Sequence, residues 1–229
     1  MPRPRRDPEV LPAQQRLENA FWALLRERPY GKITVTDIVR EAGVNRNSFY
    51  YHFSGLPELA DATIMHAVES IPIMDHASTA ENLWQEWQRT CIVAFNDPQM
   101  RKQFDHLALL AGPHSTIELT EALRDFIRLT LLGNFDLDYD RIDLSTRILL
   151  DFTVGGIVGV LRDWPNIEHR LSPNDLTNPD IATVAANLRT ALDSSEQRRP
   201  VQSLLYSADS ACGDHRTLRW YAWNMCLTG

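Results

Sequence analysis

The apolar residues near the start of the chain recur at the spacing of an α-helix. Over residues 14–28 they fall at i, i+3, i+4, i+7 and i+8, which places them on one stripe of a helix. Pro29 and Gly31 then interrupt the pattern and end the helix. The segment is therefore predicted to be an amphipathic first helix, and its stripe consists of Leu17, Ala20, Phe21, Leu24 and Leu25.

Two shorter helices are predicted next, each with its own start signal. Thr34 is placed to cap a second helix, and Asp37 stands three residues on, in the position of a capping box. Gly43 is placed to be the C′ residue of that helix, where a positive φ is usual. Asn45 can cap a third helix over residues 46–52. The pattern is therefore a helix, a tight turn and a short helix.

Helical periodicity continues through the rest of the chain. A fourth helix is predicted to open near Gly55, with Pro57 in its first turn, and to extend to about Ile71. Neither a period-2 strand pattern of useful length nor an internal repeat appears, so the predicted fold class is all-α. The further helices are predicted over residues 79–96, 99–111, 116–132, 141–163 and 179–192.

Composition narrows the class of protein. The chain has 229 residues, of which 44% are hydrophobic and 23% charged, as in a soluble protein of one large or two small domains. Its three cysteines form no CxxC and favour neither a disulfide framework nor a zinc module. The N-terminus lacks the apolar region of a signal peptide, and the longest apolar run, Phe152–Leu161, is about half of a ~20-residue membrane span. We therefore expect a soluble, cytoplasmic protein with no membrane partner.

The placement of charge changes what the net charge implies. A formal charge of −7 points away from nucleic acid as a partner. Residues 1–52, however, carry nine basic and six acidic groups, or +3, which leaves −10 on the remainder. A basic head on an acidic body is typical of proteins that interact with nucleic acid. The charge therefore directs attention to the N-terminal segment.

The third predicted helix has two faces of different chemistry. Val44, Phe49 and Phe53 lie on one side and are expected to pack against the first two helices. The other side carries Arg46 and Asn47, whose side chains can bond bidentately to guanine and adenine in a DNA major groove. Together with the preceding helix and turn, this is the helix-turn-helix arrangement. We therefore expect the third helix to enter a major groove.

Other polar residues around this turn are candidates for phosphate or thymine-methyl contacts. The second helix can also hold a phosphate at its start, through its free N–H groups. Tyr50 is equally expected to buttress a neighbouring helix, and a helix-capping role for His52 also stays open. For Arg3, Arg5 and Arg6 a solvated end is favoured over an arm in the minor groove. The candidate DNA contacts are Thr34, Thr36, Asn45, Arg46, Asn47, Ser48, Tyr50, Tyr51 and His52.

The string from Ile33 to Phe53 resembles the signature of TetR/AcrR-type bacterial transcriptional regulators. It reads I-T-V-T-D-I-V-R-E-A-G-V-N-R-N-S-F-Y-Y-H-F, and the F-Y-x-H-F ending after a G-V-x-x-x-[ST] turn is specific. The resemblance covers about residues 12–70. It implies a homodimeric, all-helical protein whose head binds DNA and whose second domain binds a small-molecule effector that alters DNA affinity. In that family the matching positions that usually touch DNA are Thr36, Arg46, Asn47, Ser48, Tyr50, Tyr51 and His52.

Two positions depart from the family pattern. Leu56 stands where members commonly have a lysine that meets a phosphate, and one lost phosphate contact should reduce the salt slope of binding by about one unit. Asn47 replaces a Gly or Ala and adds a side chain that can read a base. Neither departure removes the recognition face.

The resemblance divides the chain into three parts. Residues 10–55 are predicted to be a TetR-type helix-turn-helix DNA-binding domain and residues 56–193 a helical effector-binding and dimerisation domain. Residues 194–229 are interpreted as an irregular C-terminal tail, with a short helix that docks its tryptophans on the body as the alternative.

The last two helices of the body match the pair that forms a four-helix bundle with the partner subunit in TetR-like proteins. They are the predicted helices over residues 141–163 and 179–192. The first contains Gly155, Gly156 and Gly159, each of which costs a helix interior about 1 kcal/mol relative to alanine. Close packing between helices is the expected compensation.

An effector cavity is predicted between the body helices, although each side chain of its lining is also an ordinary core candidate. The charge of −10 on the body favours a cationic or neutral hydrophobic effector over an anion. The predicted lining residues are Trp84, Trp87, Phe95, Phe104, Leu107, Phe126 and Phe152.

Signals for catalysis are poor. No GxGxxG or GxxxxGK[ST] string occurs, and the histidines lack an i, i+4 partner, so we predict no enzyme, no cofactor and no metal site. The predicted function is a ligand-responsive transcriptional repressor that binds a palindromic operator as a homodimer. The alternative is a TetR-like protein-interaction module or coactivator with weakened DNA binding, which Leu56 and the acidic balance favour.

Overall fold

The computed structural model describes residues 11–69, 71, 83–135, 137–181, 183–184 and 190. The regular structure of these residues is mostly helical, which confirms the all-α prediction. Its elements are α1 (Ala13–Glu27), the 3₁₀ turn η1 (Tyr30–Lys32), α2 (Val35–Ala42), α3 (Arg46–His52), α4 (Leu56–Glu69), α5 (Leu83–Asn96), α6 (Pro98–Ala111), α7 (Ile117–Asn134), α8 (Leu144–Ile167) and α9 (Pro173–Leu176).

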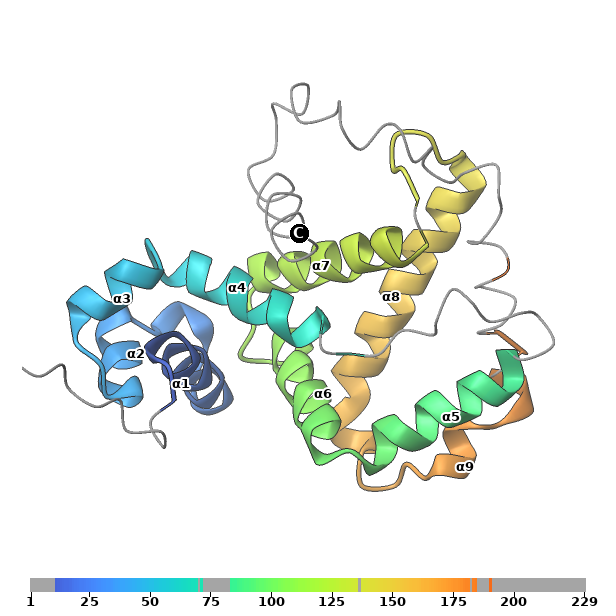
Figure 1. Ribbon diagram of the computed structural model, residues 1–229, viewed down its shortest axis with the longest axis horizontal. Helices are drawn as coiled ribbons and strands as arrows, with labels where there is room; N and C mark the ends of the chain where they lie inside the picture. Colours follow the sequence, from blue (N-terminus) through green and yellow to red (C-terminus); the bar gives the residue numbers. More distant parts are fainter. Residues whose placement is uncertain are drawn as a thin grey trace, which may run out of the picture.

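The helices form a small head and a larger body that α4 connects. Figure 1 shows α1, α2 and α3 gathered at one end, with α4 extending from them towards α6 and α7. Helix α4 packs on α1 at its head side and on α6 and α7 at its body side. Helix α8 crosses the body and packs against α6 and α7, while α5 lies beside α9.

Capping interactions determine where the short helices of the head begin. Thr34 Oγ1 accepts a hydrogen bond from Asp37 N at 3.2 Å, and Thr34 N donates to Asp37 Oδ2 at 3.1 Å, which is the predicted capping box. Gly43 ends α2 with a φ of 61°, and Asn45 Oδ1 accepts from Ser48 N at 2.7 Å at the start of α3. All three start and stop signals are confirmed.

One apolar cluster runs from the head through α4 into the body. Its head part is built around fully buried side chains of α1, α2 and α3, and its body part around α6, α7 and α8. Because this cluster is continuous from the head into the body, the head is packed onto the body. The fully buried residues of the head are Leu17, Phe21, Leu25, Ile38 and Phe49.

The end of α8 and the presence of α9 are the main differences from the expected helices. Helix α8 continues through Pro165 to Ile167, whereas the pattern placed its end at residue 163. Pro165 has no N–H to donate to Leu161, but Glu168 N donates to Trp164 O at 2.9 Å, so the last turn closes despite that loss. Helix α9 was not expected; Ser172 N donates to Asp175 Oδ2 at 2.8 Å at its start.

The structure describes only some of the C-terminal residues for which predictions were made. Residues 179–181, 183–184 and 190 are helical, in line with the predicted helix over 179–192, whose other residues lie outside the described ones. The tail over 194–229 lies entirely outside them, as do Arg3, Arg5 and Arg6. The domain boundaries at residues 55 and 193 stay predictions.

Candidate nucleic-acid interface

Helix α3 is anchored in the head by its aromatic residues. Phe49 is completely buried and Phe53 is 4% exposed, which confirms that both belong to the core. Arg16 of α1 donates from Nη1 to the carbonyl oxygen of Gly43 at 3.2 Å and so holds the turn before α3. This contact joins positions 27 residues apart, so no local pattern indicates it. The turn and α3 are therefore attached to α1 both by packing and by a hydrogen bond.

The opposite face of α3 is polar and open. Arg46, Asn47, Tyr50 and Tyr51 are all exposed, and Tyr51 reaches 84% exposure. Arg46 Nη2 donates to Tyr50 Oη at 3.3 Å, and the guanidinium carbon of Arg46 lies 5.7 Å from the centre of the Tyr50 ring. Tyr50 therefore positions Arg46 on the same helix face, a role that neither predicted interpretation of Tyr50 included.

The remaining candidate residues divide by whether their side chains are already engaged. Thr34 and Asn45 are occupied as helix caps, and His52 packs edge-on against Tyr51 with ring centres 5.0 Å apart. Thr36 is exposed, and its hydroxyl has no hydrogen-bond partner within the described residues. Ser48 is half-buried and uses its N–H in the cap of α3. The structure thus brings all nine candidates to α2, α3 and the turn between them, and their DNA contacts stay predictions.

Charge near the start of α2 is partly compensated within the head. Asp37 lies 2.7 Å from Arg40 and 3.6 Å from Arg28. The pKa of Asp37 is held below its usual value, mainly because the Thr34 hydroxyl donates a hydrogen bond to the carboxylate, and the Thr34 N–H and the two arginines add to the effect. The carboxylate is consequently charged at neutral pH, and it reduces the positive field of Arg28 and Arg40.

A capped helix, a turn on a left-handed glycine and a second helix with an open polar face define a helix-turn-helix DNA-binding head. The pattern of the bacterial regulatory proteins of the tetR family matches residues 19–63, from within α1 to within α4. The head of this chain is therefore similar to the TetR-type DNA-binding head, as the signature over residues 33–53 predicted.

A curated relative matches about a third of the chain. The uncharacterized HTH-type transcriptional regulator YxbF of Bacillus subtilis (strain 168) is 31% identical over 77 residues. The match covers 33% of this chain and 20% of the relative, so the chain spans about a fifth of the length of the relative that it matches.

One solved structure shares the fold of this chain, and another is similar at a lower score. The fatty acid degradation regulator FadR from Bacillus halodurans matches with a TM-score of 0.50 at 16% identity, over 83% of this chain and 100% of FadR. The TetR family repressor AlkX from Dietzia sp. strain DQ12-45-1b matches with a TM-score of 0.42 at 19% identity, over 79% of this chain and 97% of AlkX. The likeness to FadR shows a common fold.

The structure describes four of the seven side chains predicted to line an effector cavity, and these four differ in burial. Leu107 is buried, Phe104 and Phe126 are half-buried, and Phe152 is 75% exposed on the outer side of α8. Phe104 packs against Trp164 with ring centres 5.2 Å apart, which is an ordinary core contact. The other three predicted lining side chains lie outside the described ones; these are Trp84, Trp87 and Phe95.

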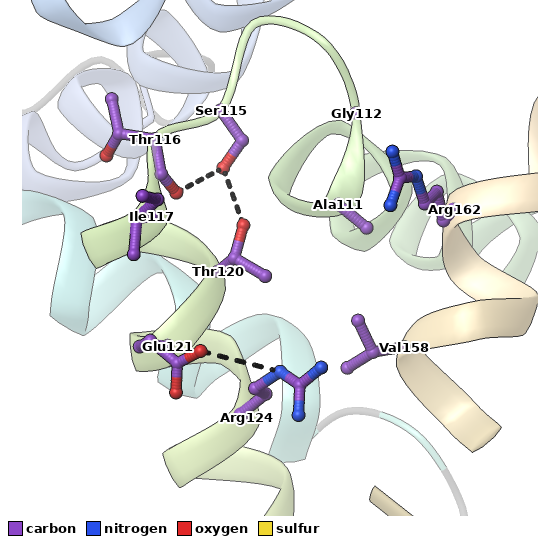
Figure 2. A pocket seen from close by; sticks show the side chains of 10 residues that line it. All are labelled: Ala111, Gly112, Ser115, Thr116, Ile117, Thr120, Glu121, Arg124, Val158 and Arg162. Carbon is purple, nitrogen blue, oxygen red and sulfur yellow. Dashed lines mark hydrogen bonds and ion pairs between the residues drawn. The ribbon is translucent and has the colours of Figure 1, made fainter. Parts of the chain in front are cut away.

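A cavity of about 330 Å³ lies elsewhere in the body, between the α6–α7 loop, the first turns of α7 and the C-terminal half of α8 (Figure 2). Polar and charged side chains form much of its wall, including the guanidinium groups of Arg124 and Arg162. Sequence reasoning missed this site because its residues come from three separate elements and share no local pattern. The complete lining is Ala111, Gly112, Ser115, Thr116, Ile117, Thr120, Glu121, Arg124, Val158 and Arg162.

Helix α8 turns an apolar face outward along most of its length. A Cβ built at Gly155, Gly156 or Gly159 meets nothing within 4 Å, so no helix of the described chain packs closely on these glycines. By length and composition α8 would pass as a membrane span, which is weak evidence because core helices of soluble proteins pass too. The exposed apolar residues of this face are Leu144, Ile148 and Phe152, and the exposed Val160 lies at its edge.

Proposed function

We propose that the protein is a cytoplasmic homodimeric repressor that binds a palindromic operator through two α3 helices and changes its DNA affinity when a small molecule binds the body. The observation that carries the proposal is the open polar face of α3 on a packed head in which α2 and α3 are capped. Because the backbone of α3 is already ordered by this packing, its base-reading side chains can bind DNA without a further loss of backbone entropy.

Each exposed group of α3 has a role that suits its chemistry. Arg46 donates a bidentate pair to guanine, and Asn47 does the same for adenine. Tyr51 and Thr36 are placed for contacts with phosphates, which set the position of the helix rather than its sequence preference. Because the body is acidic, affinity has to come mainly from this face.

The outward face of α8 supports the homodimer. Exposed apolar patches of this kind mark interaction sites in soluble proteins. The three glycines with open Cβ positions allow the backbone of another helix to approach closely. Two copies joined through α8 present two α3 helices, which must lie about 34–36 Å apart to occupy successive major grooves on one side of DNA.

A second candidate function is a protein-interaction module that keeps the TetR-type fold but has weak DNA binding. Leu56 favours it, because the side chain at the start of α4 supplies no positive charge to a phosphate. The partial neutralisation of Arg28 and Arg40 by Asp37 favours it as well.

Binding to selected DNA distinguishes the two functions. The 229-residue protein is used to enrich sequences from random duplexes at about 100 mM salt, and affinity for the enriched site is then measured for Arg46→Ala and for the control Arg141→Ala. A repressor should lose about 1–3 kcal/mol of affinity with Arg46→Ala. Arg141 is exposed in the turn before α8, so its substitution should leave affinity unchanged. Failure to enrich any sequence would contradict the proposal and favour the interaction module.

A further inference from the structure

We propose that the cavity between the α6–α7 loop, α7 and α8 binds a small organic carboxylate, and that this occupant is the effector. The role of this occupant as an effector rests on the proposed function, whereas the binding of a carboxylate rests on the cavity alone. Four features of the cavity support it: its size, its incompletely paired guanidinium groups, its apolar wall and its connection to the head.

The size is that of a small ligand. The cavity measures about 330 Å³, at the lower end of the range of roughly 300–1,000 Å³ for ligand sites. Figure 2 shows the hydroxyl groups of Ser115 and Thr120 on one side and Arg124 and Arg162 projecting from α7 and α8 on the others. Thr120 Oγ1 donates to Leu110 O at 3.0 Å, and Ser115 Oγ donates to Thr116 O at 3.2 Å. These hydroxyl groups are therefore used within the protein, and the two guanidinium groups determine the charge that the site accepts.

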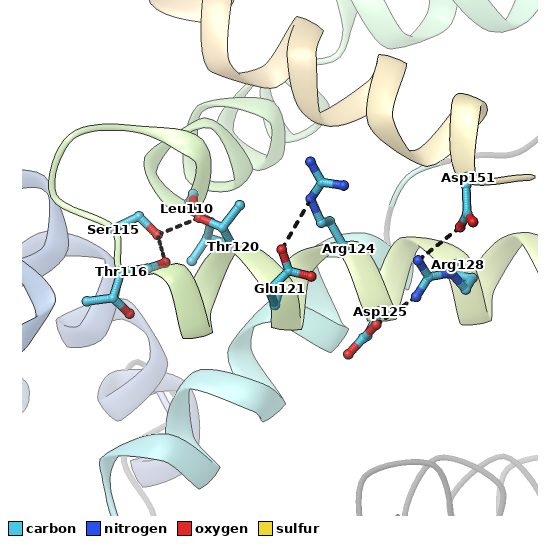
Figure 3. Close-up of polar contacts among 9 residues, drawn as sticks. All are labelled: Leu110, Ser115, Thr116, Thr120, Glu121, Arg124, Asp125, Arg128 and Asp151. Atoms are coloured by element: carbon cyan, nitrogen blue, oxygen red, sulfur yellow. Dashed lines mark hydrogen bonds and ion pairs between the residues drawn. The ribbon is translucent and has the colours of Figure 1, made fainter.

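The two cavity arginines differ from the arginine next to them. One turn further along α7, Arg128 is paired with Asp125 at 2.8 Å and with Asp151 at 3.1 Å (Figure 3). Arg124 has only Glu121, 3.7 Å away from its Nε. The Nε atoms of Arg124 and Arg128 are both buried without a hydrogen bond within the described residues, so the two arginines differ in the pairing of their Nη groups.

Arg162 makes neither a hydrogen bond nor an ion pair with any described residue. The acid-rich body thus pairs Arg128 twice and leaves the donors of Arg124 and Arg162 for a ligand. With Glu121 as the one acidic residue of the lining, the wall carries a net positive charge.

The chemistry of the wall indicates a carboxylate with a short apolar part. Planar guanidinium groups bond bidentately to carboxylate oxygens. Ala111, Ile117 and Val158 add apolar surface beside them. The negative overall charge of the body favoured a cationic or neutral effector, but the local charge of this cavity is positive. The local charge matters more, because a ligand responds mainly to charges within a Debye length of about 8–10 Å.

The cavity is directly connected to the head. The loop that forms its upper wall contains His114, whose carbonyl oxygen accepts from Tyr30 N at 2.9 Å and whose Nδ1 lies 3.0 Å from the carbonyl oxygen of Leu25. Leu25 belongs to α1 and Tyr30 to η1, so one loop contacts the cavity on one side and the head on the other. A ligand that favours one conformation of this loop changes the stability of this contact with the head, which gives a coupling between ligand and DNA.

The test begins with direct calorimetric titration of the 229-residue protein. The probes are acetate, hexanoate and benzoate, each compared with its neutral amide, and inorganic phosphate. At least one carboxylate should bind saturably and at least tenfold more tightly than its amide and than phosphate. Arg124→Gln and Arg162→Gln should each weaken that binding at least tenfold, whereas the control Arg170→Gln, which removes an exposed charge beyond the end of α8, should not.

The coupling between carboxylate binding and operator affinity is tested with the same probe. Saturating carboxylate should change operator affinity at least fivefold in the parent protein and less than twofold in His114→Ala, which should still bind the probe. Circular dichroism melting and sedimentation check that each variant folds and keeps its oligomeric state.

Three results would overturn the site: no saturable carboxylate binding, equal binding of the amide or of phosphate, or unchanged binding by both arginine variants. A bound carboxylate that leaves operator affinity unchanged would overturn its role as effector. Operator affinity measured without any probe tests the proposed function separately, so intact DNA binding without carboxylate binding contradicts this inference alone.

Discussion

The head and the body place their apolar residues differently. The head consists of three helices whose phenylalanines are buried inside it, with Phe21 and Phe49 completely enclosed, and its most exposed helix face is polar. The body contains α8, a helix of 24 residues that buries one face against α6 and α7 and leaves another apolar face open. Phe152, on that open face, is 75% exposed.

The difference indicates which contacts each region still has to make. The open face of the head offers hydrogen-bond donors and acceptors, which suits a polar partner such as DNA. The open face of the body offers hydrocarbon, which gains free energy when another apolar surface removes it from water. The head is therefore expected to bury its apolar residues within one chain, whereas the body is expected to bury its open apolar face only in a dimer.

The largest expected effect concerns the packing of the head. Phe49→Ala should lower the free energy of unfolding by about 3–5 kcal/mol, because it leaves a cavity in a fully buried site. Tyr51→Ala, two residues further along α3 and 84% exposed, should change it by less than about 0.5 kcal/mol. Urea denaturation followed by circular dichroism measures both. Equal losses of stability in the two variants would show that α3 does not have one buried and one exposed face.

The next effect concerns the open face of α8. Phe152→Asp should weaken the dimer by at least 30-fold, or about 2 kcal/mol, because a charge would be buried against an apolar surface. The control Ile92→Asp changes an exposed apolar residue of α5 and should leave the dimer intact. Sedimentation equilibrium measures both dissociation constants. A dimer that tolerates the change at Phe152 would place the interface on another face.

A smaller effect concerns the caps of the head. Thr34→Ala should cost about 1 kcal/mol of stability, because Asp37 N loses its acceptor, whereas Thr36→Ala removes a hydroxyl without a partner and should cost less than half of that.

The pH dependence follows from the lowered pKa of Asp37. Its stabilising contribution is present above its unfolded value of 3.8 and is lost as the pH falls through the lower folded value. Thr34→Ala should therefore flatten the acid side of the stability curve, as denaturation between pH 2 and 6 would reveal. An unchanged slope would mean that the capping box is not the source of the shift.

The smallest effect lies where α1 meets α4. His66 Nδ1 is 3.1 Å from Glu18 Oε2, and this hydrogen bond is the main reason why the pKa of His66 is raised above 6.5. The charged pair stabilises the fold fully below pH 6.5, and its contribution is lost as the pH rises through the folded pKa.

Glu18→Gln should lower the pKa of His66, since the desolvation that opposes protonation then dominates. The exposed Glu27→Gln is the control, and NMR titration of the imidazole protons measures the change. A pKa that stays the same in both variants would show that α1 and α4 are not linked through this pair.

Much of the head was predictable because its signals are local. The capping box of Thr34 and Asp37, the left-handed Gly43 and the cap at Asn45 each act within four residues of the chain. The helical period likewise places Phe49 inward and Arg46 outward. Such features need no knowledge of the rest of the fold, so the sequence predicted them correctly.

The site in the body was not predictable in this way. An effector cavity lined by Phe104, Leu107 and Phe126 was expected because aromatic and apolar residues recur there, yet periodicity does not reveal which element each one faces. The cavity that carries Arg124 and Arg162 depends on how α7 crosses α8. The outward position of Phe152 depends on which side of α8 meets α6 and α7.

The sequence by itself thus determined most of the helices, the caps of α2 and α3, the two faces of α3 and the resemblance of the head to the TetR type. Tertiary structure decided the pairing of the body arginines, the contact of His114 with the head and the open face of α8. The physical reason is the sequence separation of the interacting residues. Caps and helical faces arise from neighbours a few residues apart. Charge pairing and cavities arise from residues such as Arg128 and Asp151, which are 23 positions apart and meet only when the helices have packed.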